Sequence, residues 1–339
     1  MNVQKLSQKE ITDLLQGKDD KWLFEEASKI KGNIFGKDVY IRGVVEFSNF
    51  CKEDCFYCGL RRSNSCLVRY RLAPLDIMRC AEVADSLKIK TLVLQSGEDY
   101  FYSKEQIAGL IQRVKSRYDI VVTLSIGERR NDELKFWFDV GAERYLLKVE
   151  TFDEKLYEQL RPGKRLSDRI GKVMYLKELG YETGSGIIVG LPGQTVDSIS
   201  RDIIKLSELN LEMIACGPFI PHPETPLGGY PPGDPLTTIR VVAILRILNP
   251  SANIPSTSAL SSFGEEWRRA GLKAGANVVM PSLTPEKVKD LYSIYPGKNS
   301  GYDEIFDAVE GIKRLIREAG FIPSESKGYS KRRLDEKCS

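Results

Sequence analysis

Three closely spaced cysteines are the residues of this chain best suited to chemistry. Cys51, Cys55 and Cys58 form the pattern C-x3-C-x2-C within VVEFSNFCKEDCFYCGLRRSN. Three such thiolates can bind three irons of a cubane iron–sulfur cluster and leave the fourth iron open to another ligand. Because an open iron inside a protein is a place for reaction, the spacing predicts a catalytic cluster rather than one that only carries electrons.

A zinc site is the alternative that the cysteines leave open. Structural zinc takes four ligands, and Cys66 follows Cys58 closely enough to be the fourth. The only histidine, His222, is remote in sequence. The spacing and the aromatic pair Phe56-Tyr57 before the last cysteine favour iron–sulfur. The remaining cysteines are interpreted as ordinary thiols: Cys66, Cys80, Cys216 and Cys338.

Length and composition restrict the class of protein. The 339 residues, 42% of them hydrophobic, suffice for the core of one large domain. The net charge of +3 comes from interspersed signs, so we expect no nucleic-acid partner. Without an apolar leader or a run long enough to span a membrane, we expect a cytoplasmic protein with no membrane partner. Seven cysteines are few and odd in number, which disfavours a disulfide framework.

Short β-branched runs alternate with amphipathic segments along the chain. The predicted strands are 39–47, 91–95, 120–126, 144–149, 184–189, 213–217, 253–257 and 277–280. The predicted helices are 74–87, 104–117, 132–140, 168–179, 196–209, 236–248, 265–274 and a last one within 301–320. Pro74 near a helix start and Gly141 and Gly180 after helix ends support these boundaries.

Eight strands, each followed by helical sequence, predict an α/β fold, a parallel (β/α)8 barrel of the TIM type. An open doubly wound sheet is the alternative. We expect residues 1–35 to form an N-terminal helical cap, 36–325 the barrel with its C-terminal helix, and 326–339 a mobile tail. In such a barrel the active site lies at the carboxyl ends of the strands, where the cysteine loop follows the first strand.

The cysteine motif at the end of a first barrel strand resembles the radical S-adenosylmethionine (SAM) superfamily. Further motifs follow in order, among them LVLQSGED, RYLLKVET, GSGIIVGLPGQT, GPFIPHPETPL and LYSIYPGK. Over residues 30–325 they resemble the HydE family of FeFe-hydrogenase maturases. A 3-methylornithine synthase, which is a lysine mutase, shares the early motifs and is the second interpretation. A non-catalytic zinc or redox-sensor protein is the alternative of another class.

The resemblance implies cofactors, a reaction and partners. It implies one 4Fe–4S cluster whose open iron is chelated by SAM, and one-electron reductive cleavage of SAM to methionine and a 5′-deoxyadenosyl radical. The substrate implied is a small sulfur-containing iron–cysteine precursor of the hydrogenase cluster. The partners implied are a reductant such as ferredoxin or flavodoxin and other hydrogenase maturases.

The resemblance also implies roles for individual residues. Cys51, Cys55 and Cys58 are the implied cluster ligands. The implied SAM contacts are Tyr57, Gln95, Ser96, Gly97, Glu150, Arg169, Met213 and Ile220. The implied substrate contacts are Thr123, Arg144, Thr257, Ser258, Tyr292 and Tyr295.

One departure from the family concerns a second cluster. Some relatives carry extra cysteines after YPGK, where this chain reads NSGYDEIFDAVEGIKRL. A second cluster deep in the barrel would have only Cys80 and Cys216 as internal thiols, which is too few. We therefore expect a single cluster.

Overall fold

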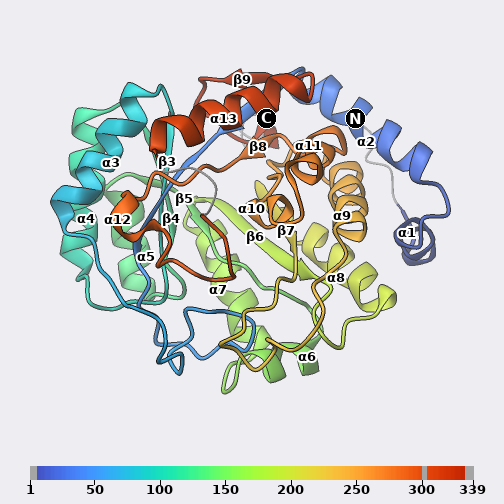
Figure 1. Cartoon of the computed structure of the whole chain (residues 1–339), viewed down its shortest axis with the longest axis horizontal. Helices are drawn as coiled ribbons and strands as arrows, with labels where there is room; N and C mark the ends of the chain where they lie inside the picture. Colours follow the sequence, from blue (N-terminus) through green and yellow to red (C-terminus); the bar gives the residue numbers. More distant parts are fainter. Residues whose placement is uncertain (1–5, 300–303, 333–339) are drawn as a thin grey trace.

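Apolar runs in the first two thirds of the sequence form most of an inner ring of strands. The computed structural model describes residues 6–299 and 304–332. One parallel sheet contains, in chain order (Figure 1), β2 (Gly43–Ser48), β3 (Thr91–Ser96), β4 (Val121–Ser125), β5 (Ala142–Leu146), β6 (Glu182–Val189) and β7 (Met213–Pro218). Helices cover such sheets, so both faces are buried and the strands are largely apolar.

Backbone hydrogen bonds close this sheet into a ring. After β7, Asn253 N donates to Glu212 O at 2.8 Å. Just past β8 (Val278–Val279), Pro281 O accepts a hydrogen bond of 2.9 Å from Val44 N of β2. The arrangement is the predicted TIM-type (β/α)8 barrel, not an open sheet.

Two predicted strands differ from the observed ones. The run 39–47 divides at Arg42 into β1 (Asp38–Ile41) and β2. Strand β1 pairs with the ring strand β8 on one side and with β9 (Ile322–Ser324) on the other. Strand β9 was not predicted. The run 253–257 makes only isolated bridges, since Pro255 lacks the N–H group that a regular ladder requires.

Helices surround the ring close to their predicted positions. They are α3 (Pro74–Ser86), α4 (Lys104–Arg117), α5 (Asn131–Asp139), α7 (Leu166–Glu178), α8 (Val196–Glu208), α9 (Pro235–Leu248), α11 (Glu265–Lys273) and α13 (Ile305–Glu318). The short helices α6 (Glu154–Leu160), α10 (Ser258–Ser261) and α12 (Glu286–Lys289) were not predicted. Among the described residues, no helix is both long and apolar enough to cross a bilayer.

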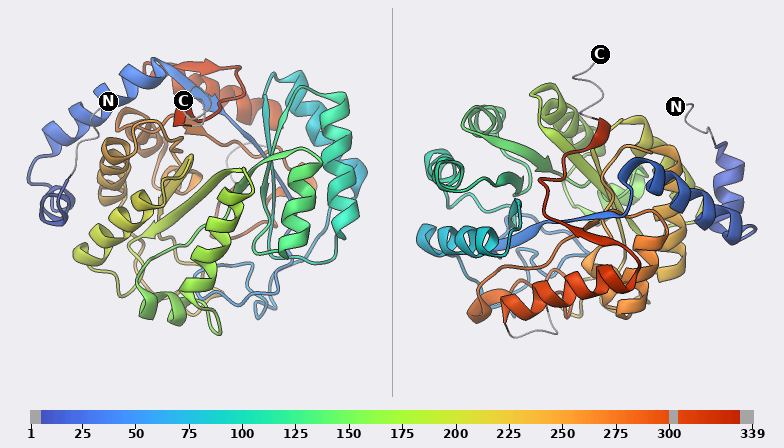
Figure 2. Two further views of the ribbon diagram at one scale, coloured as in Figure 1. Left: turned by 180° about the vertical axis from the view of Figure 1, so that it is seen from behind. Right: turned by 90° about the horizontal axis from the view of Figure 1, so that it is seen from above.

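Two N-terminal helices cover part of the outer surface (Figure 2). Helix α1 (Gln8–Leu15) packs on α8, and α2 (Asp20–Phe35) packs on α9. Every residue of 241–247 in α9 is buried, because α2 covers the face that would otherwise meet solvent. Helices therefore occupy Gln8–Leu15 and Asp20–Phe35 within the segment 1–35 that was expected to form a helical cap, and residues 1–5 lie outside the described part.

A buried ion pair fills the amino-terminal end of the barrel. Arg144 Nε of β5 donates to Glu182 Oε2 of β6 at 2.5 Å, and both side chains are fully buried. Arg144 Nη1 donates to Thr91 Oγ1 at 2.9 Å. Glu182 and Thr91 are the first residues of their strands, so Arg144 lies at the end opposite the cysteine loop. This corrects the expectation that Arg144 contacts the substrate.

The C-terminal segment closes the same end. Lys327 O accepts a hydrogen bond from Arg144 Nη2 at 2.9 Å, and Gly328 O accepts one from Arg42 Nη2 at 3.2 Å. Ser330 N donates to the buried Glu182 carboxylate at 2.7 Å. In the right-hand view of Figure 2, this red segment crosses the middle of the molecule.

These bonds correct the expectation of a mobile tail from residue 326. Two buried guanidinium groups need acceptors, and the backbone carbonyls of residues 327 and 328 supply them. Residues 327–332 therefore belong to the barrel. The remainder of the expected tail, 333–339 with Cys338, lies outside the described residues.

We predict that truncation after Glu325 lowers the thermal unfolding midpoint by at least about 5 °C, because buried charged groups lose their partners. Differential scanning calorimetry measures this change. Lys331→Ala is the matched control and should leave the midpoint unchanged. The Lys331 side chain is not among the hydrogen-bond partners of Arg42, Arg144 or Glu182. Equal midpoints for the truncated chain and the wild type would contradict a structural role for this segment.

Candidate functional site

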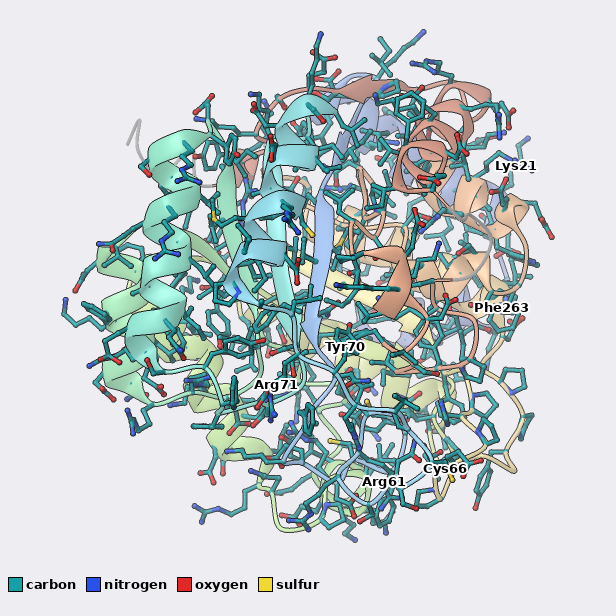
Figure 3. The ribbon with its side chains drawn as sticks, turned by 60° about the vertical axis from the view of Figure 1, so that its left-hand side comes forward. Lys21, Arg61, Cys66, Tyr70, Arg71 and Phe263 are labelled. Atoms are coloured by element: carbon teal, nitrogen blue, oxygen red, sulfur yellow. The ribbon has the colours of Figure 1, made fainter. Side chains whose placement is uncertain are left out.

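The cysteine loop follows β2 and is held at the carboxyl ends of the strands. Figure 3 places Arg61 and Cys66 of this loop beyond the end of the sheet. Lys52 N donates to Glu98 O at 3.1 Å, which fixes the loop against the turn after β3. Cys51 Sγ accepts a hydrogen bond from Glu98 N at 3.3 Å. These contacts hold the first cysteine beside the QSGED turn.

Gly97 permits this close approach. A Cβ atom at position 97 would lie 2.2 Å from Phe50 O and 2.8 Å from Cys51 Cβ. Any larger residue would therefore push the cysteine loop away from β3. Gly97 packs against Phe50 and Cys51 of the cysteine loop and does not line the barrel cavity. Its implied contact with SAM therefore remains a proposal.

Arg69 joins the two ends of the cysteine loop. Its Nη1 atom donates to Asn49 O at 2.6 Å and to Leu60 O at 2.9 Å. Its Nη2 atom donates to Arg61 O at 2.7 Å and to Asn64 O at 3.3 Å. Sequence analysis missed this residue, because its role depends on carbonyl groups that only the folded loop brings together.

The three thiols are at least half-buried, which disfavours their charged form. Burial raises the pKa of Cys51 to about 11. Burial also raises the pKa of Cys55, although the nearby Arg161 guanidinium opposes part of that rise. Thiols of this kind stay neutral until a metal displaces the proton. They therefore suit metal ligation better than unassisted nucleophilic chemistry.

The donor set fits a cubane cluster. In the parts of the chain that the structure describes, no three His, Cys, Asp or Glu side chains converge on one ion. A cubane does not require such convergence, because each cysteine binds a different iron. Cys66, the possible fourth zinc ligand, is exposed.

A cavity of about 360 Å³ lies inside the barrel, next to the cysteine loop. Thr123 Oγ1 and Thr257 Oγ1 both line it and are buried without a hydrogen-bond partner. Buried hydroxyl groups are normally satisfied, so the two threonines mark where a polar ligand would bind. The other predicted residues that line the cavity are Tyr57, Cys58, Gln95, Ser96, Glu150, Arg169, Met213, Ile220, Ser258 and Tyr295.

Glu150 has an unusual backbone conformation in the cavity wall. Its φ angle is 75°, a left-handed conformation that L-residues other than glycine, asparagine and aspartate seldom adopt. Hydrogen bonds of 2.9 Å from Glu150 N to Gly186 O and from Ile188 N to Glu150 O hold it there. Its Oε2 atom lies 2.8 Å from Lys148 Nζ, without hydrogen-bond geometry. Strain of this kind clusters at functional sites.

Buried charges surround the cysteine loop. Arg169 Nη1 lies 2.8 Å from Glu128 Oε1, and Arg169 Nε donates to Lys148 O at 2.9 Å. Arg161 Nη2 lies 3.7 Å from Glu98 Oε1. Burial raises the pKa of Glu98 despite the adjacent Arg169. Sequence analysis missed Arg161 and the role of Glu98, because arginine and glutamate are common on surfaces.

Four further residues lie in or beside the cavity wall. Tyr292 is buried and does not line the cavity, although its ring centroid is 4.9 Å from Lys298 Nζ. Lys298, Lys148 and Arg42 line the cavity and were not assigned roles from the sequence. Lys298 lies in the quoted YPGK motif, which was the available signal.

We predict that Glu150→Gln weakens SAM binding about tenfold, because a neutral amide accepts hydrogen bonds less strongly than a carboxylate. Glu150→Gly should weaken binding at least as much without lowering the unfolding midpoint, since glycine relieves the left-handed strain. Equilibrium dialysis with SAM and calorimetry measure the two effects. Unchanged affinity in both variants would exclude Glu150 from the SAM site.

Comparisons with known proteins agree with this geometry. The family model described as the radical SAM superfamily matches residues 45–205. The [FeFe] hydrogenase maturase subunit HydE of Thermotoga maritima is 42% identical over 310 residues, which cover 91% of this chain and 89% of that protein. The 3-methylornithine synthase of Methanosarcina acetivorans is 29% identical over 295 residues, covering 86% and 83%.

Solved structures show the same fold. The methylornithine synthase PylB matches with a TM-score of 0.84 and 25% identity, covering 99% of this chain and 97% of that one. The maturase HydG, with a TM-score of 0.79 and 20% identity over 99% and 77% of the chains, supports the fold alone. From the cysteine loop, the barrel and these matches, the chain belongs to the radical SAM superfamily and, within it, to the family of the hydrogenase maturase HydE.

Proposed function

We propose that this protein is a HydE-like radical SAM enzyme that acts in the cytoplasm on a small precursor of the FeFe-hydrogenase active-site cluster. The observation that carries the proposal is 42% identity to HydE over 91% of the chain. It is supported by a cysteine loop that opens on a cavity inside the barrel.

Cys51, Cys55 and Cys58 hold the 4Fe–4S cluster in this proposal. When bound, the cluster and SAM together supply a 5′-deoxyadenosyl radical by one-electron reductive cleavage. The chain itself fixes the cysteine loop through Arg69 and the β3 turn. The barrel wall keeps water away from the reacting groups.

SAM is proposed to bind between the cysteine loop and the strand ends. Glu150 accepts hydrogen bonds from the ribose hydroxyls, and Arg169 pairs with the carboxylate through Nη2, since Nε and Nη1 are used by the protein. Tyr57, Met213 and Ile220 flank the nucleoside. Gln95, Ser96 and the backbone at Gly97 face the methionine moiety.

The substrate in this proposal is a small molecule bound by the few polar groups of the cavity. Thr123 and Thr257 offer unsatisfied hydroxyl groups, and Ser258 Oγ lies 2.6 Å from Tyr295 Oη. The cations Lys148 and Arg42 also reach the cavity. Such a lining suits a carboxylate-bearing compound, as the proposed iron–cysteine precursor is. Tyr292 supports this wall from the core.

The proposal includes partners and a single cluster. A reductant such as ferredoxin or flavodoxin supplies the electron, and the other hydrogenase maturases provide or receive the small molecule. Cys80 lies on α3 and Cys216 on β7, and both are buried. Burial raises the pKa of each thiol to about 12, as in ordinary core cysteines.

The second candidate function is that of a 3-methylornithine synthase, favoured by the TM-score of 0.84 to PylB. Substrate assays separate the two functions. Lysine should leave the deoxyadenosine yield unchanged, and the iron–cysteine precursor should be consumed. Formation of methylornithine from lysine would reverse this assignment.

We predict that the wild type, reconstituted anaerobically, binds about four irons per chain and cleaves SAM with dithionite. Cys55→Ala should lose cleavage by at least about 100-fold, because the cluster loses a ligand. Cys66→Ala is the matched control and should keep both properties, since Cys66 is exposed. Iron counting and deoxyadenosine chromatography measure the outcome. About eight irons per chain would contradict the single cluster, and full cleavage by Cys55→Ala would contradict the ligand assignment.

A further inference from the structure

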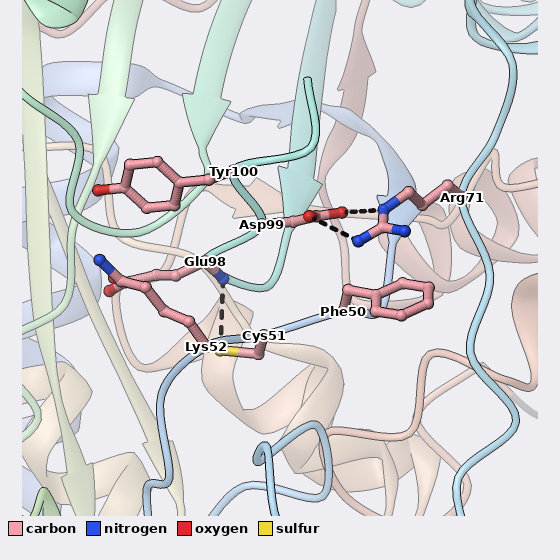
Figure 4. Close-up of a pocket in the computed structure, with 7 residues that line it drawn as sticks. All are labelled: Phe50, Cys51, Lys52, Arg71, Glu98, Asp99 and Tyr100. Carbon is pink, nitrogen blue, oxygen red and sulfur yellow. Dashed lines mark hydrogen bonds and ion pairs between the residues drawn. The ribbon is translucent and has the colours of Figure 1, made fainter. Parts of the chain in front are cut away.

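The cysteine loop has a second face that does not open on the barrel cavity. Cys58 lines the inner cavity, whereas Cys51 lines an open depression of about 450 Å³ on the outside (Figure 4). The other residues that line this depression are Phe50, Lys52, Arg71, Glu98, Asp99 and Tyr100. The proposed cluster therefore lies between a substrate chamber and an outer surface.

The acidic side chains of the depression are more deeply buried than its basic side chains. The carboxylates of Glu98 and Asp99 lie at its base, with side chains 5% and 4% exposed. The cations Lys52 and Arg71 stand above them, 46% and 29% exposed. A molecule approaching from solvent therefore meets positive charge first, although each cation has a carboxylate beneath it.

Aromatic rings surround the same depression. Phe101 is 63% exposed, and Tyr100 is also exposed. The Arg71 guanidinium lies 3.6 Å from the ring centroid of Phe50 and 4.4 Å from that of Phe101. Lys52 Nζ lies 4.2 Å from the Tyr100 centroid. Aromatic side chains and arginine are enriched at protein interfaces relative to the rest of the surface.

We propose that this surface, which we call the Cys51 face, binds a small acidic electron-carrier protein. The inference rests on the proposed function, which requires one electron for each SAM cleaved. The carrier is oxidised by one electron and the cluster is reduced by one, so no further reactant is needed. The electron enters beside Cys51, while SAM and substrate stay on the side of Cys58, in the barrel cavity.

Charge and shape favour this occupant. Lys52 and Arg71 attract acidic side chains and speed the encounter, and the exposed Phe101 adds apolar contact. The residues of the face come from the cysteine loop, from position 71 and from the turn after β3. The loop is held to this turn by the hydrogen bonds from Lys52 N and to Cys51 Sγ, and Arg71 Nε donates to Asp99 Oδ2 at 2.7 Å. A rigid face next to the redox centre suits brief encounters, as electron transfer requires.

A cross-linking experiment tests the face independently of catalysis. The reconstituted holoenzyme is treated with a carbodiimide in the presence of a purified acidic ferredoxin, and the linked peptides are identified by mass spectrometry. We expect amide bonds from Lys52 to ferredoxin carboxylates at low salt and their loss at high salt. Links at Lys21 on α2, an exposed lysine of the opposite region (Figure 3), provide the control. Equal linking at both lysines, or linking of Lys52 to a second copy of this chain, would overturn the proposal.

Kinetics then separate this inference from the proposed function. Phe101→Ser should lower the ferredoxin-driven rate of SAM cleavage about three- to tenfold at limiting ferredoxin. The dithionite-driven rate should stay within about twofold of the wild type, and Lys21→Gln should change neither rate. Equal ferredoxin-driven rates in all variants would refute the Cys51 face. Failure of dithionite to drive cleavage in the wild type would instead refute the proposed function, while the cross-links would still decide where ferredoxin binds.

Discussion

The buried carboxylate of Glu46 joins β2, the strand that precedes the cysteine loop, to residues that follow β8 in the chain. Ser282 Oγ donates to it at 2.7 Å, Thr284 donates a further hydrogen bond, and Lys298 forms an ion pair with it. Burial by itself would raise the pKa of Glu46, but Lys298 and these hydrogen bonds lower it. The carboxylate therefore stays charged, and residues far apart in the sequence are joined at the rim of the site.

The two ends of the barrel use buried charge for different purposes. At the amino-terminal end, Arg144 and Glu182 pair with each other and with backbone groups of the C-terminal segment. At the carboxyl end, Glu150, Thr123 and Thr257 keep unsatisfied polar atoms that face a cavity. Because buried polar groups are costly unless they are paired, the Arg144–Glu182 pair is structural, and the unpaired hydroxyl groups of Thr123 and Thr257 mark a place for a ligand.

Local patterns predicted much of the fold and part of the site. The cysteine spacing, the strand periods and the position of Glu150 after a strand are properties of short segments, and the structure places them together. Arg144 shows where such reasoning stops. The residue belongs to a strand as expected, but whether it faces substrate or the closed end depends on the partner strand and on residue 327. The same holds for Arg161, whose partners Glu53 and Glu98 come from distant segments. The partners of Arg69 are near in sequence, but only the folded loop turns their carbonyl groups toward it.

The sequence by itself determined the cluster motif, the alternating strand and helix order, and the family to which the chain belongs. These depend on residue types at short spacing, which hydrophobic burial and metal ligation fix locally. Only the tertiary structure decided how the ring closes at Val44, how the C-terminal segment fills one end, and that Cys51 and Cys58 face different sides of the loop. Those features depend on contacts between segments far apart in the chain, and no local pattern specifies which buried charge meets which partner.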